Sequence, residues 1–366
     1  MPALEDAPEN TSGDTLGDSA EDQVVRHADI GGRSVAWSSV GSGPLLVIGG
    51  WWSSHLELDW ADPAFRAFVR RLARTTRVVR YDRPGAGLSD RGPAPADRDE
   101  EVAVLAGVVG EAARPGERVH LFGASSGCPV ATTYAAREPD RVDRLILYGG
   151  YVRGVDIAAP AARESMLALV GQHWGLGSRV LSEVFMPSAN ARDRQAFAAF
   201  QRRSASREGA VAALRAVYAL DASDAVAAVS APTLVLHRRH DGAIPFALGR
   251  DLAERIRRAT FVELVGDEHF PWRGDSGAVV DAVETFLAGR APAAQPPRRT
   301  ALDPTLSARE REVLRLVAAG RTDAEIAAEL VISAHTVHRH VANIRSRLGV
   351  TSRAAAAAWA VDHDLL

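Results

Sequence analysis

The chain has little cysteine and no excess of charge of either sign. Its 366 residues include one cysteine, Cys128, so an internal disulfide cannot form, which fits a reducing cytoplasm. Its 43 basic and 46 acidic residues nearly cancel, so the whole molecule lacks the basic character of a general nucleic-acid-binding protein. Any DNA-binding site must therefore be a local patch.

Features that direct a chain to a membrane are also lacking. The residues before the first basic side chain, Arg26, are rich in Asp and Glu, whereas a signal peptide begins with basic residues and an apolar stretch. No apolar run approaches the roughly 18 residues that a membrane span needs. We therefore expect a cytoplasmic protein that does not contact a membrane.

Short apolar segments bounded by glycine or proline recur from Gln23 onward. They lie at residues 34–37, 45–48, 78–81, 119–122, 145–148, 233–236 and 260–264. Between the later ones are stretches of helical length, at 65–72, 99–113 and 248–256. This alternation predicts an α/β domain with a mostly parallel sheet.

Breaks in this pattern divide the chain further. Residues 1–22 are acidic and poor in large apolar side chains, which predicts a disordered tail. The α/β pattern covers 23–289, and within it the Ala-rich segment at about 155–229 predicts a helical lid over the carboxyl edge of the sheet. Residues 290–304 contain several prolines and predict an extended linker, followed by a compact helical domain at 305–366.

A nucleophile elbow stands between a predicted strand and a predicted helix. Gly123-Ala-Ser-Ser-Gly127 follows the strand at 119–122 and precedes a helix that we expect to start near Pro129. Asp241 and His269 each follow a later strand, at the sheet edge where α/β proteins place their sites. The pattern predicts a triad in which Ser125 attacks, His269 takes its proton and Asp241 orients the imidazole.

An acyl-transfer site also needs two backbone N–H donors for the oxyanion. The residue after the nucleophile, Ser126, supplies one, and Trp51 in the loop after the strand at 45–48 is the expected second donor.

Other residues of catalytic or metal-binding type are not expected to take part in the chemistry. We expect Asp267 and Glu268 to be solvated loop charges, His55 and His240 to lie at a pocket rim or in the core, and Cys128 to be a small packed residue. The His237-x-x-His240 pair lacks further metal ligands, so we expect no metal ion and no cofactor.

The chain from about residue 23 to 288 resembles the α/β-hydrolase superfamily. Residues 80–90 look like that family's segment preceding the elbow, and residues 54–60 with 269–275 are similar to a bacterial subgroup often fused to adenylate cyclase or transcriptional-regulator domains. Gly49-Gly50 stands where many members have His-Gly. The resemblance implies a serine hydrolase or a ligand sensor that retains the triad, and both alternatives remain open.

Three helices are predicted near the end of the chain. Ser307 and Glu310 form the pattern of a capping box, and the helix they start stops at Gly320. Thr322 and Glu325 repeat that pattern for a second helix that runs to Leu330. A third helix runs from Ser333 to about Leu348. Its apolar residues recur at steps of four, three and four, at Val337, Val341, Ile344 and Leu348, so this face should be buried.

The other face of the third helix carries no acid. The stretch from residue 330 to 361 contains arginine but neither Asp nor Glu, which is the local patch that DNA phosphates require. This unit resembles the LuxR-type helix-turn-helix, on residues 309–314, 325–327, Thr336-Val337, His340 and 347–350. Thr336 falls at the family's phosphate-contacting position. The face opposite the apolar one presents His338, Arg339 and Ala342, with Arg345 nearby, so we expect these residues and Arg347 to contact DNA as well. His338 replaces a lysine common in this family, and the family dimerises through its last helix.

Together these features predict a transcriptional regulator whose α/β-hydrolase-fold domain senses, and in one version hydrolyses, a small and largely apolar ligand. The expected partners are promoter DNA, a small-molecule ligand or ester substrate, RNA polymerase and a second copy of the chain. The alternative is an active serine hydrolase or esterase with an appended DNA-binding domain. A generic ester assay beside a DNA-binding assay separates these two functions.

Overall fold

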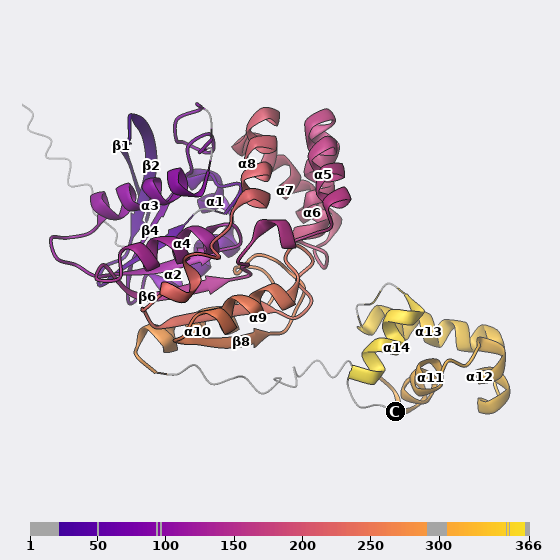
Figure 1. The fold of residues 1–366 in the computed structure, drawn as a ribbon. Coiled ribbons are helices and arrows are strands. Elements are labelled where there is room, and N and C mark those ends of the chain that lie inside the picture. The colour runs from indigo at the N-terminus through magenta and orange to yellow at the C-terminus, as the bar shows by residue number, and fades with distance from the viewer. Residues whose placement is uncertain are drawn as a thin grey trace, which may run out of the picture. The chain divides into compact units, whose positions relative to one another are not determined.

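The computed structural model describes residues 22–290 except 50, 93 and 96, and residues 306–362 except 349 and 351. The predicted acidic tail, apart from Asp22, and nearly all of the predicted linker lie outside the described residues. The chain divides into two compact units, Met1–Ala294 and Gln295–Leu366. Each unit has its own apolar core, and Figure 1 shows an α/β unit and a small helical unit.

An eight-stranded sheet forms the centre of the first unit, in the order β1-β2-β4-β3-β5-β6-β7-β8. The strands are β1 (Val24–Ile30), β2 (Arg33–Val40), β3 (Leu45–Gly49), β4 (Arg77–Tyr81), β5 (Val119–Ala124), β6 (Val142–Tyr148), β7 (Thr233–Arg238) and β8 (Ala259–Leu264). Strands β3 to β8 are parallel, whereas β1 and β2 are antiparallel at one edge. The predicted, mostly parallel α/β sheet is therefore confirmed.

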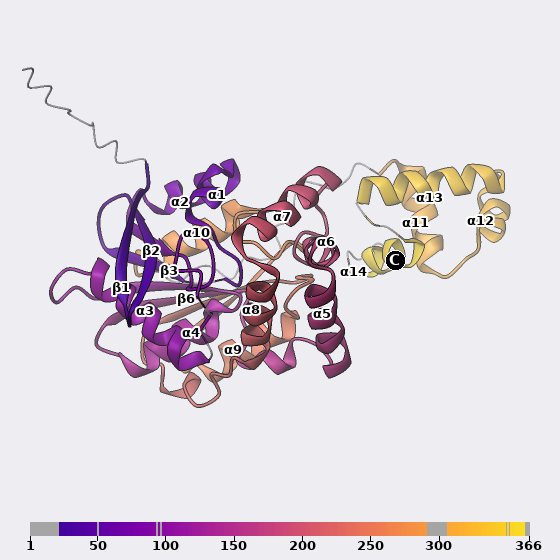
Figure 2. The same cartoon turned by 90° about the horizontal axis from the view of Figure 1, so that it is seen from above.

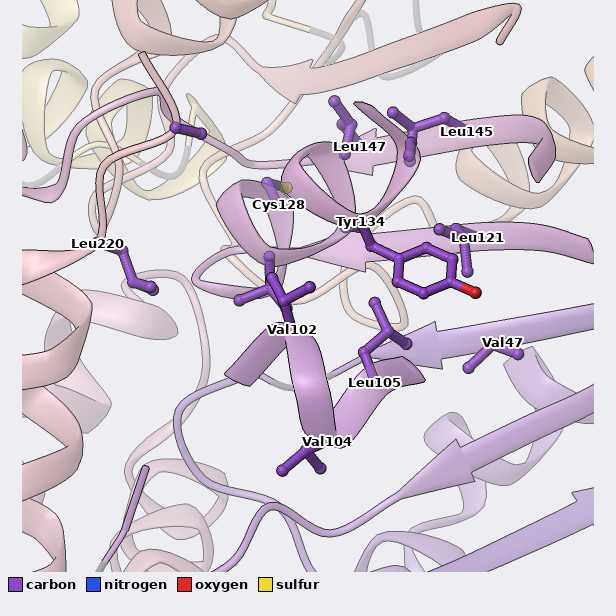
Figure 3. Close-up of a cluster of buried hydrophobic side chains, with 14 of the residues drawn as sticks. Val47, Val102, Val104, Leu105, Leu121, Cys128, Tyr134, Leu145, Leu147 and Leu220 are labelled. Atoms are coloured by element: carbon purple, nitrogen blue, oxygen red, sulfur yellow. The ribbon is translucent and has the colours of Figure 1, made fainter. Parts of the chain in front are cut away.

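Helices cover both faces of the sheet because alternate strand residues point to opposite sides. Leu45 and Val47 belong to one apolar cluster, and Leu46 and Ile48 belong to the other. The first cluster includes α3 (Arg98–Ala112), α4 (Gly127–Arg137) and α9 (Phe246–Arg255), and the second includes α2 (Pro63–Leu72) and α10 (Ser276–Leu287). Figure 3 shows part of the first cluster, where side chains of α3 and α4 face those of β3, β5 and β6.

The chain between β6 and β7 is helical. It forms η1 (Gly154–Asp156), α5 (Pro160–Gln172), α6 (Trp174–Phe185), α7 (Ala191–Ser204), α8 (Arg207–Ala219) and η2 (Val226–Ala228). Asn190 and Ser206 cap α7 and α8 by accepting backbone N–H groups of the first turn. Figures 1 and 2 show α5 to α8 gathered on the side of the unit away from β1. We refer to these four helices as the lid.

The second unit consists of α11 (Ala308–Ala318), α12 (Asp323–Leu330), α13 (Ala334–Leu348) and α14 (Arg353–Asp362). Both expected capping boxes are present, Ser307 with Glu310 and Thr322 with Glu325. Its core includes Val313, Leu314, Ile326, Val337, Ile344 and Ala360. No helix within the described residues has both the length and the apolar character to cross a membrane.

Candidate acyl-transfer site and DNA-binding helix

The nucleophile elbow is a strained turn between β5 and α4. Ser125 has a φ of 53°, in the left-handed region that residues with a side chain rarely adopt, and its N–H donates to the carbonyl of Tyr148 at 2.9 Å. A Cβ atom at Gly123 would lie 2.8 Å from the carbonyl oxygen of Gly127, so only glycine fits there. Helix α4 begins at Gly127, two residues before the predicted start, and its N-terminus directly follows the elbow.

His269 and Asp241 form a buried hydrogen-bonded pair. The Nδ1 of His269 lies 2.8 Å from Oδ2 of Asp241 and 3.1 Å from Oδ1. Oδ1 also accepts the N–H groups of Ala243 and Ile244, at 2.9 and 3.1 Å. Burial alone would raise the pKa of Asp241, but the charge and hydrogen bond of His269 outweigh it and leave the pKa below its ordinary value. An ionised Asp241 fixes the proton on Nδ1, so Nε2 is left to act as the base.

Ser125 and His269 line one crevice. It measures about 10 Å³, and aromatic side chains including Trp51, Trp52 and Phe185 complete its wall. The Nε2 of His269 is buried and makes no hydrogen bond to any described residue, so the bond from Ser125 to the base is not formed in this state. Such bonds are often absent without a ligand and tighten when one binds.

The two residues expected to supply oxyanion donors lie beside the elbow. Gly49 pairs with Gly123 across β3 and β5, which brings the loop after β3 next to Ser125. Trp51 lines the crevice, and its indole packs against Trp272 at 5.0 Å between ring centroids. Ser126 is buried at the N-terminus of α4. Gly50, which precedes Trp51, lies outside the described residues.

Arg238 holds the loop that carries His269, a role that the sequence analysis missed. Its side chain is 1% exposed at the end of β7. One guanidinium nitrogen, Nη1, donates to the carbonyls of Glu268 and Phe270 at 2.7 and 3.1 Å, and Nη2 donates to the carbonyl of Arg273. The carbonyls on both sides of His269 are therefore fixed by one cation.

The lid contacts the same loop. The N–H of His269 donates to the carbonyl of Phe185, the last residue of α6, at 2.9 Å. The two rings stack with centroids 5.4 Å apart, and Ser188 donates to Asp267 at 2.5 Å. The expectation that Glu268 is solvated is wrong, because it is 7% exposed, and burial followed by repulsion from Asp267 raises its pKa to about 7.

The other histidines and the cysteine considered in the sequence analysis take no part in the triad. His237 is fully buried, its Nε2 lies 3.0 Å from the carbonyl oxygen of Ile244, and burial lowers its pKa. His55 is buried and caps α1 (Leu56–Ala61), whereas His240 is exposed. Cys128 is buried against the carbonyl of Gly123, and burial raises the pKa of its thiol. Among the described side chains, no three His, Cys, Asp or Glu gather as a metal site would need.

Helix α13 presents a polar face on the second unit. Val337, Val341 and Ile344 are buried, whereas His338, Arg339 and Ala342 are exposed on other sides of the helix. The predicted burial of the apolar face is confirmed for these three residues, whereas the fourth, Leu348, is half-buried against the same core. Thr336 shares a hydrogen bond of 2.8 Å with Ser333 at the helix start, and Arg345 is half-buried.

Two arginines of the acid-free stretch pair with acids of neighbouring helices. Nη1 of Arg347 lies 2.7 Å from Oε2 of Glu310, the capping-box residue of α11. Arg353 pairs with Asp323 at 2.5 Å, and Nδ1 of His338 is 3.8 Å from the same carboxylate. A stretch without acids in the sequence is therefore partly neutralised by acids from other helices.

Comparisons with known proteins match each unit separately. Residues 43–272 match the family model described as "alpha/beta hydrolase fold", and residues 304–360 match "Bacterial regulatory proteins, luxR family". Over 228 residues the chain is 31% identical to 2-hydroxymuconate semialdehyde hydrolase of Pseudomonas sp. (strain CF600), covering 59% of this chain and 76% of that protein. The enol-lactonase of Burkholderia xenovorans LB400 matches with a TM-score of 0.60 and 24% identity, covering 72% of this chain and 100% of its own, which shows a shared fold.

The second unit is similar to proteins named as transcriptional regulatory proteins. Over 69 residues the chain is 48% identical to the probable transcriptional regulatory protein NarL of Mycobacterium tuberculosis (strain CDC 1551 / Oshkosh), which is 19% of this chain. The match covers 32% of that protein, so the chain spans about a third of the relative's length. The chain therefore belongs to the α/β-hydrolase fold family and carries a DNA-binding domain of the LuxR family at its C-terminal end.

Proposed function

We propose that the protein is a one-component transcriptional regulator that binds promoter DNA as a homodimer and senses a small, largely apolar ligand through its hydrolase-fold unit. The observation that carries the proposal is the presence on one chain of a hydrolase fold and a LuxR-family DNA-binding domain. The proposal places the protein in the cytoplasm, with RNA polymerase as a further partner at the promoter.

The DNA contacts are assigned to the polar face of α13. Arg339 and Ala342 are exposed there and suit base-edge contacts in the major groove. Thr336, His338 and Arg345 are assigned to phosphates or neighbouring edges. Because Arg347 is paired with Glu310, we assign it mainly to holding α13 against α11, with any phosphate contact secondary.

The hydrolase unit is also arranged for acyl transfer. The 2.8 Å contact between His269 and Asp241 favours this second function, in which Oγ of Ser125 attacks an ester carbonyl carbon and its proton passes to Nε2 of His269. The N–H groups of Ser126 and Trp51 would stabilise the oxyanion. The imidazolium then protonates the leaving alcohol, and water releases the acid from Ser125. In a regulator, such hydrolysis would remove the ligand and end its signal.

Operator binding is tested with the full-length protein by selecting bound fragments of genomic DNA and titrating the selected sequence. Arg339→Ala should cost about 1–3 kcal/mol at that site. Arg315→Ala, at an exposed position on α11, is the matched control and should change affinity little. Equal binding by wild type and an Arg339→Ala/Arg345→Ala double variant would contradict the assignment of α13 as the recognition helix.

The acyl-transfer step is tested with a serine-directed fluorophosphonate probe. Labelling should occur at Ser125, disappear in Ser125→Ala and fall sharply in His269→Ala, because the alcohol then loses its base. Labelling at Ser126, or none on folded protein, would show that the elbow does not hold an activated nucleophile. The regulator would then act by ligand binding alone.

A further inference from the structure

The first unit contains a cavity of about 840 Å³ that differs from the crevice over Ser125. It lies between α1, α2, α7 and the loop after β8, and its lining includes Trp51, Leu58, Met186, Phe197, Phe200 and Trp272. Its volume falls within the range of roughly 300–1,000 Å³ that small-molecule sites occupy. An aromatic and aliphatic lining of this kind suits a flat apolar ligand.

Three aromatic side chains lie between this cavity and the nucleophile. Trp51, Phe270 and Trp272 line both the cavity and the 10 Å³ crevice, whereas Ser125 and His269 line only the crevice. The ring of Trp272 lies 5.0 Å from that of Trp51 and stacks on Phe270 at 4.8 Å. A ligand can therefore occupy the cavity without meeting Ser125. The crevice itself has room for no more than about one water molecule.

Most acids that line the cavity are already paired with cations. Asp59 lies 3.4 Å from Nη1 of Arg80, and Asp62 pairs with Arg273 at 2.5 Å. The third, Asp193, accepts a hydrogen bond from the amide of Asn190 at 2.8 Å, which leaves its charge uncompensated.

Two arginines of α7 supply the opposite charge at the cavity rim. Arg192 and Arg203 both line the cavity and are exposed, and neither has an ion pair or a hydrogen bond among the described residues. Against the single uncompensated carboxylate of Asp193, these two cations leave an excess of positive charge. Arginine binds a carboxylate through two parallel N–H groups, which favours a planar acid over a simple point charge.

We infer that this cavity is the ligand-binding site of the hydrolase unit and takes an aromatic carboxylic acid. The aromatic ring packs among Phe197, Phe200 and Trp272, and the carboxylate faces Arg192 and Arg203 at the rim. This inference rests on the proposed ligand-sensing function and deepens it, since it separates the site that senses the ligand from the site that could cleave an ester. Trp51, Phe270 and Trp272, which line both sites, are the side chains through which one site could affect the other.

The charge requirement is tested by calorimetric titration of the full-length protein with 2-naphthoate and with 2-naphthylmethanol, which has the same rings and no charge. The carboxylate should bind about five- to tenfold more tightly, as expected for a rim ion pair. Arg192→Ala/Arg203→Ala should reduce its affinity to that of the alcohol. Equal affinities for both probes in the wild type, or binding of neither, would overturn the inference.

The location is tested by filling the cavity. Ala199 lines it, so Ala199→Trp should abolish binding of both probes. Gln195→Trp is the matched control, because it adds the same side chain at an exposed position of α7 that does not line the cavity. Ser125→Ala should bind 2-naphthoate as the wild type does. Retained binding in folded Ala199→Trp, or lost binding in Ser125→Ala, would place the ligand elsewhere. If Ala199→Trp does not fold, Arg192→Ala/Arg203→Ala still tests whether 2-naphthoate binds at the rim of this cavity.

These titrations contain no DNA, so their outcome is independent of the regulatory proposal. Binding of 2-naphthoate in the cavity by a protein that selects no operator would contradict the proposed function and leave the site intact. Conversely, a protein that binds its operator but neither probe would contradict the site and leave DNA binding intact.

Discussion

At Ser125 the backbone conformation required for chemistry opposes stability. A φ of 53° costs a residue with a Cβ atom about 1–2 kcal/mol, and glycine avoids most of that cost. We therefore expect Ser125→Gly to exceed Ser125→Ala in free energy of unfolding by about 1 kcal/mol. Urea denaturation of the two variants measures the difference, and since both lack the hydroxyl, lost hydrogen bonds do not enter it. Equal stabilities would show that the elbow carries no strain.

Arg238 is expected to act on the reactivity of Ser125 through the position of His269. In Arg238→Met the carbonyls of Glu268, Phe270 and Arg273 lose their common donor, and each buried carbonyl left unpaired costs about 1–3 kcal/mol. The rate of fluorophosphonate labelling should fall and its pH profile should shift, with partial recovery in Arg238→Lys.

Arg239→Met is the control for this prediction. Arg239 is the next residue along the chain, but it is exposed and paired with Glu263 on the neighbouring strand. Its loss should leave both the labelling rate and the pH profile unchanged. If Arg238→Met merely lowers the melting temperature and leaves the profile as in the wild type, the arginine is structural and does not position the base.

The triad residues could be predicted from the sequence because they follow predicted strands. Arg238 could not, because it acts by binding backbone carbonyl groups of a loop. Ser125 directly follows β5, and Asp241 and His269 lie in the loops after β7 and β8, so parallel strands bring all three to one edge of the sheet. Arg238 acts on carbonyl groups of a loop whose path depends on the lid, and no spacing in the sequence encodes that path. Glu268 was expected in solvent for the same reason, since Ser188 and Phe185 of the lid region cover its loop.

At the scale of elements, strands buried on both sides were the most predictable. The segments that became β3, β5 and β7 are buried throughout, whereas β1 has the sequence VVRHADI and is exposed or half-buried along its whole length. Its pairing with β2 at the sheet edge stabilises it, and that pairing is not visible in its own composition. The bounds of α11, α12 and α13 were predicted to within about two residues, and capping boxes mark the starts of the first two.

The turn between α12 and α13 carries avoidable strain. Val331 ends α12 with a φ of 53°, and its side chain is 88% exposed, so the β-branched residue has the cost of this conformation without a packing benefit. Val331→Gly should stabilise the second unit by about 1 kcal/mol. Ala319→Gly at the end of α11, where φ is −73°, should give no such gain. The thermal unfolding transition of the second unit measures the stability change in both variants. A lower melting temperature in Val331→Gly than in the wild type would contradict the prediction.

Across the first unit, buried histidines make stability depend on pH. Burial lowers the pKa of His55, His120 and His237 below the ordinary value of 6.5, so each is neutral in the folded chain. As the pH falls, these histidines take up protons first in the unfolded chain. Their contribution to the free energy of unfolding is therefore fully present above pH 6.5 and decreases below it. We expect these histidines to lower the melting temperature of this unit by a few degrees between pH 7 and 5.5. Asp59 and Glu268, whose pKa values burial raises to about 7, give the opposite dependence and offset part of this fall. His237→Gln should reduce that dependence, whereas substitution of the exposed His240 should not.

In a ligand-sensing regulator, ligand binding and operator binding are coupled in the full-length chain. If a compound that binds the hydrolase unit changes operator affinity, operator DNA must change the affinity for that compound by the same factor, because the two equilibria are linked. Couplings of about 1–3 kcal/mol would give shifts of roughly 5- to 150-fold in both titrations. Ser125→Ala should keep the coupling and, where the ligand is an ester, prolong the response. Should well-bound compounds leave operator affinity unchanged in the full-length protein, the sensor proposal fails, and an active hydrolase with an appended DNA-binding domain takes its place.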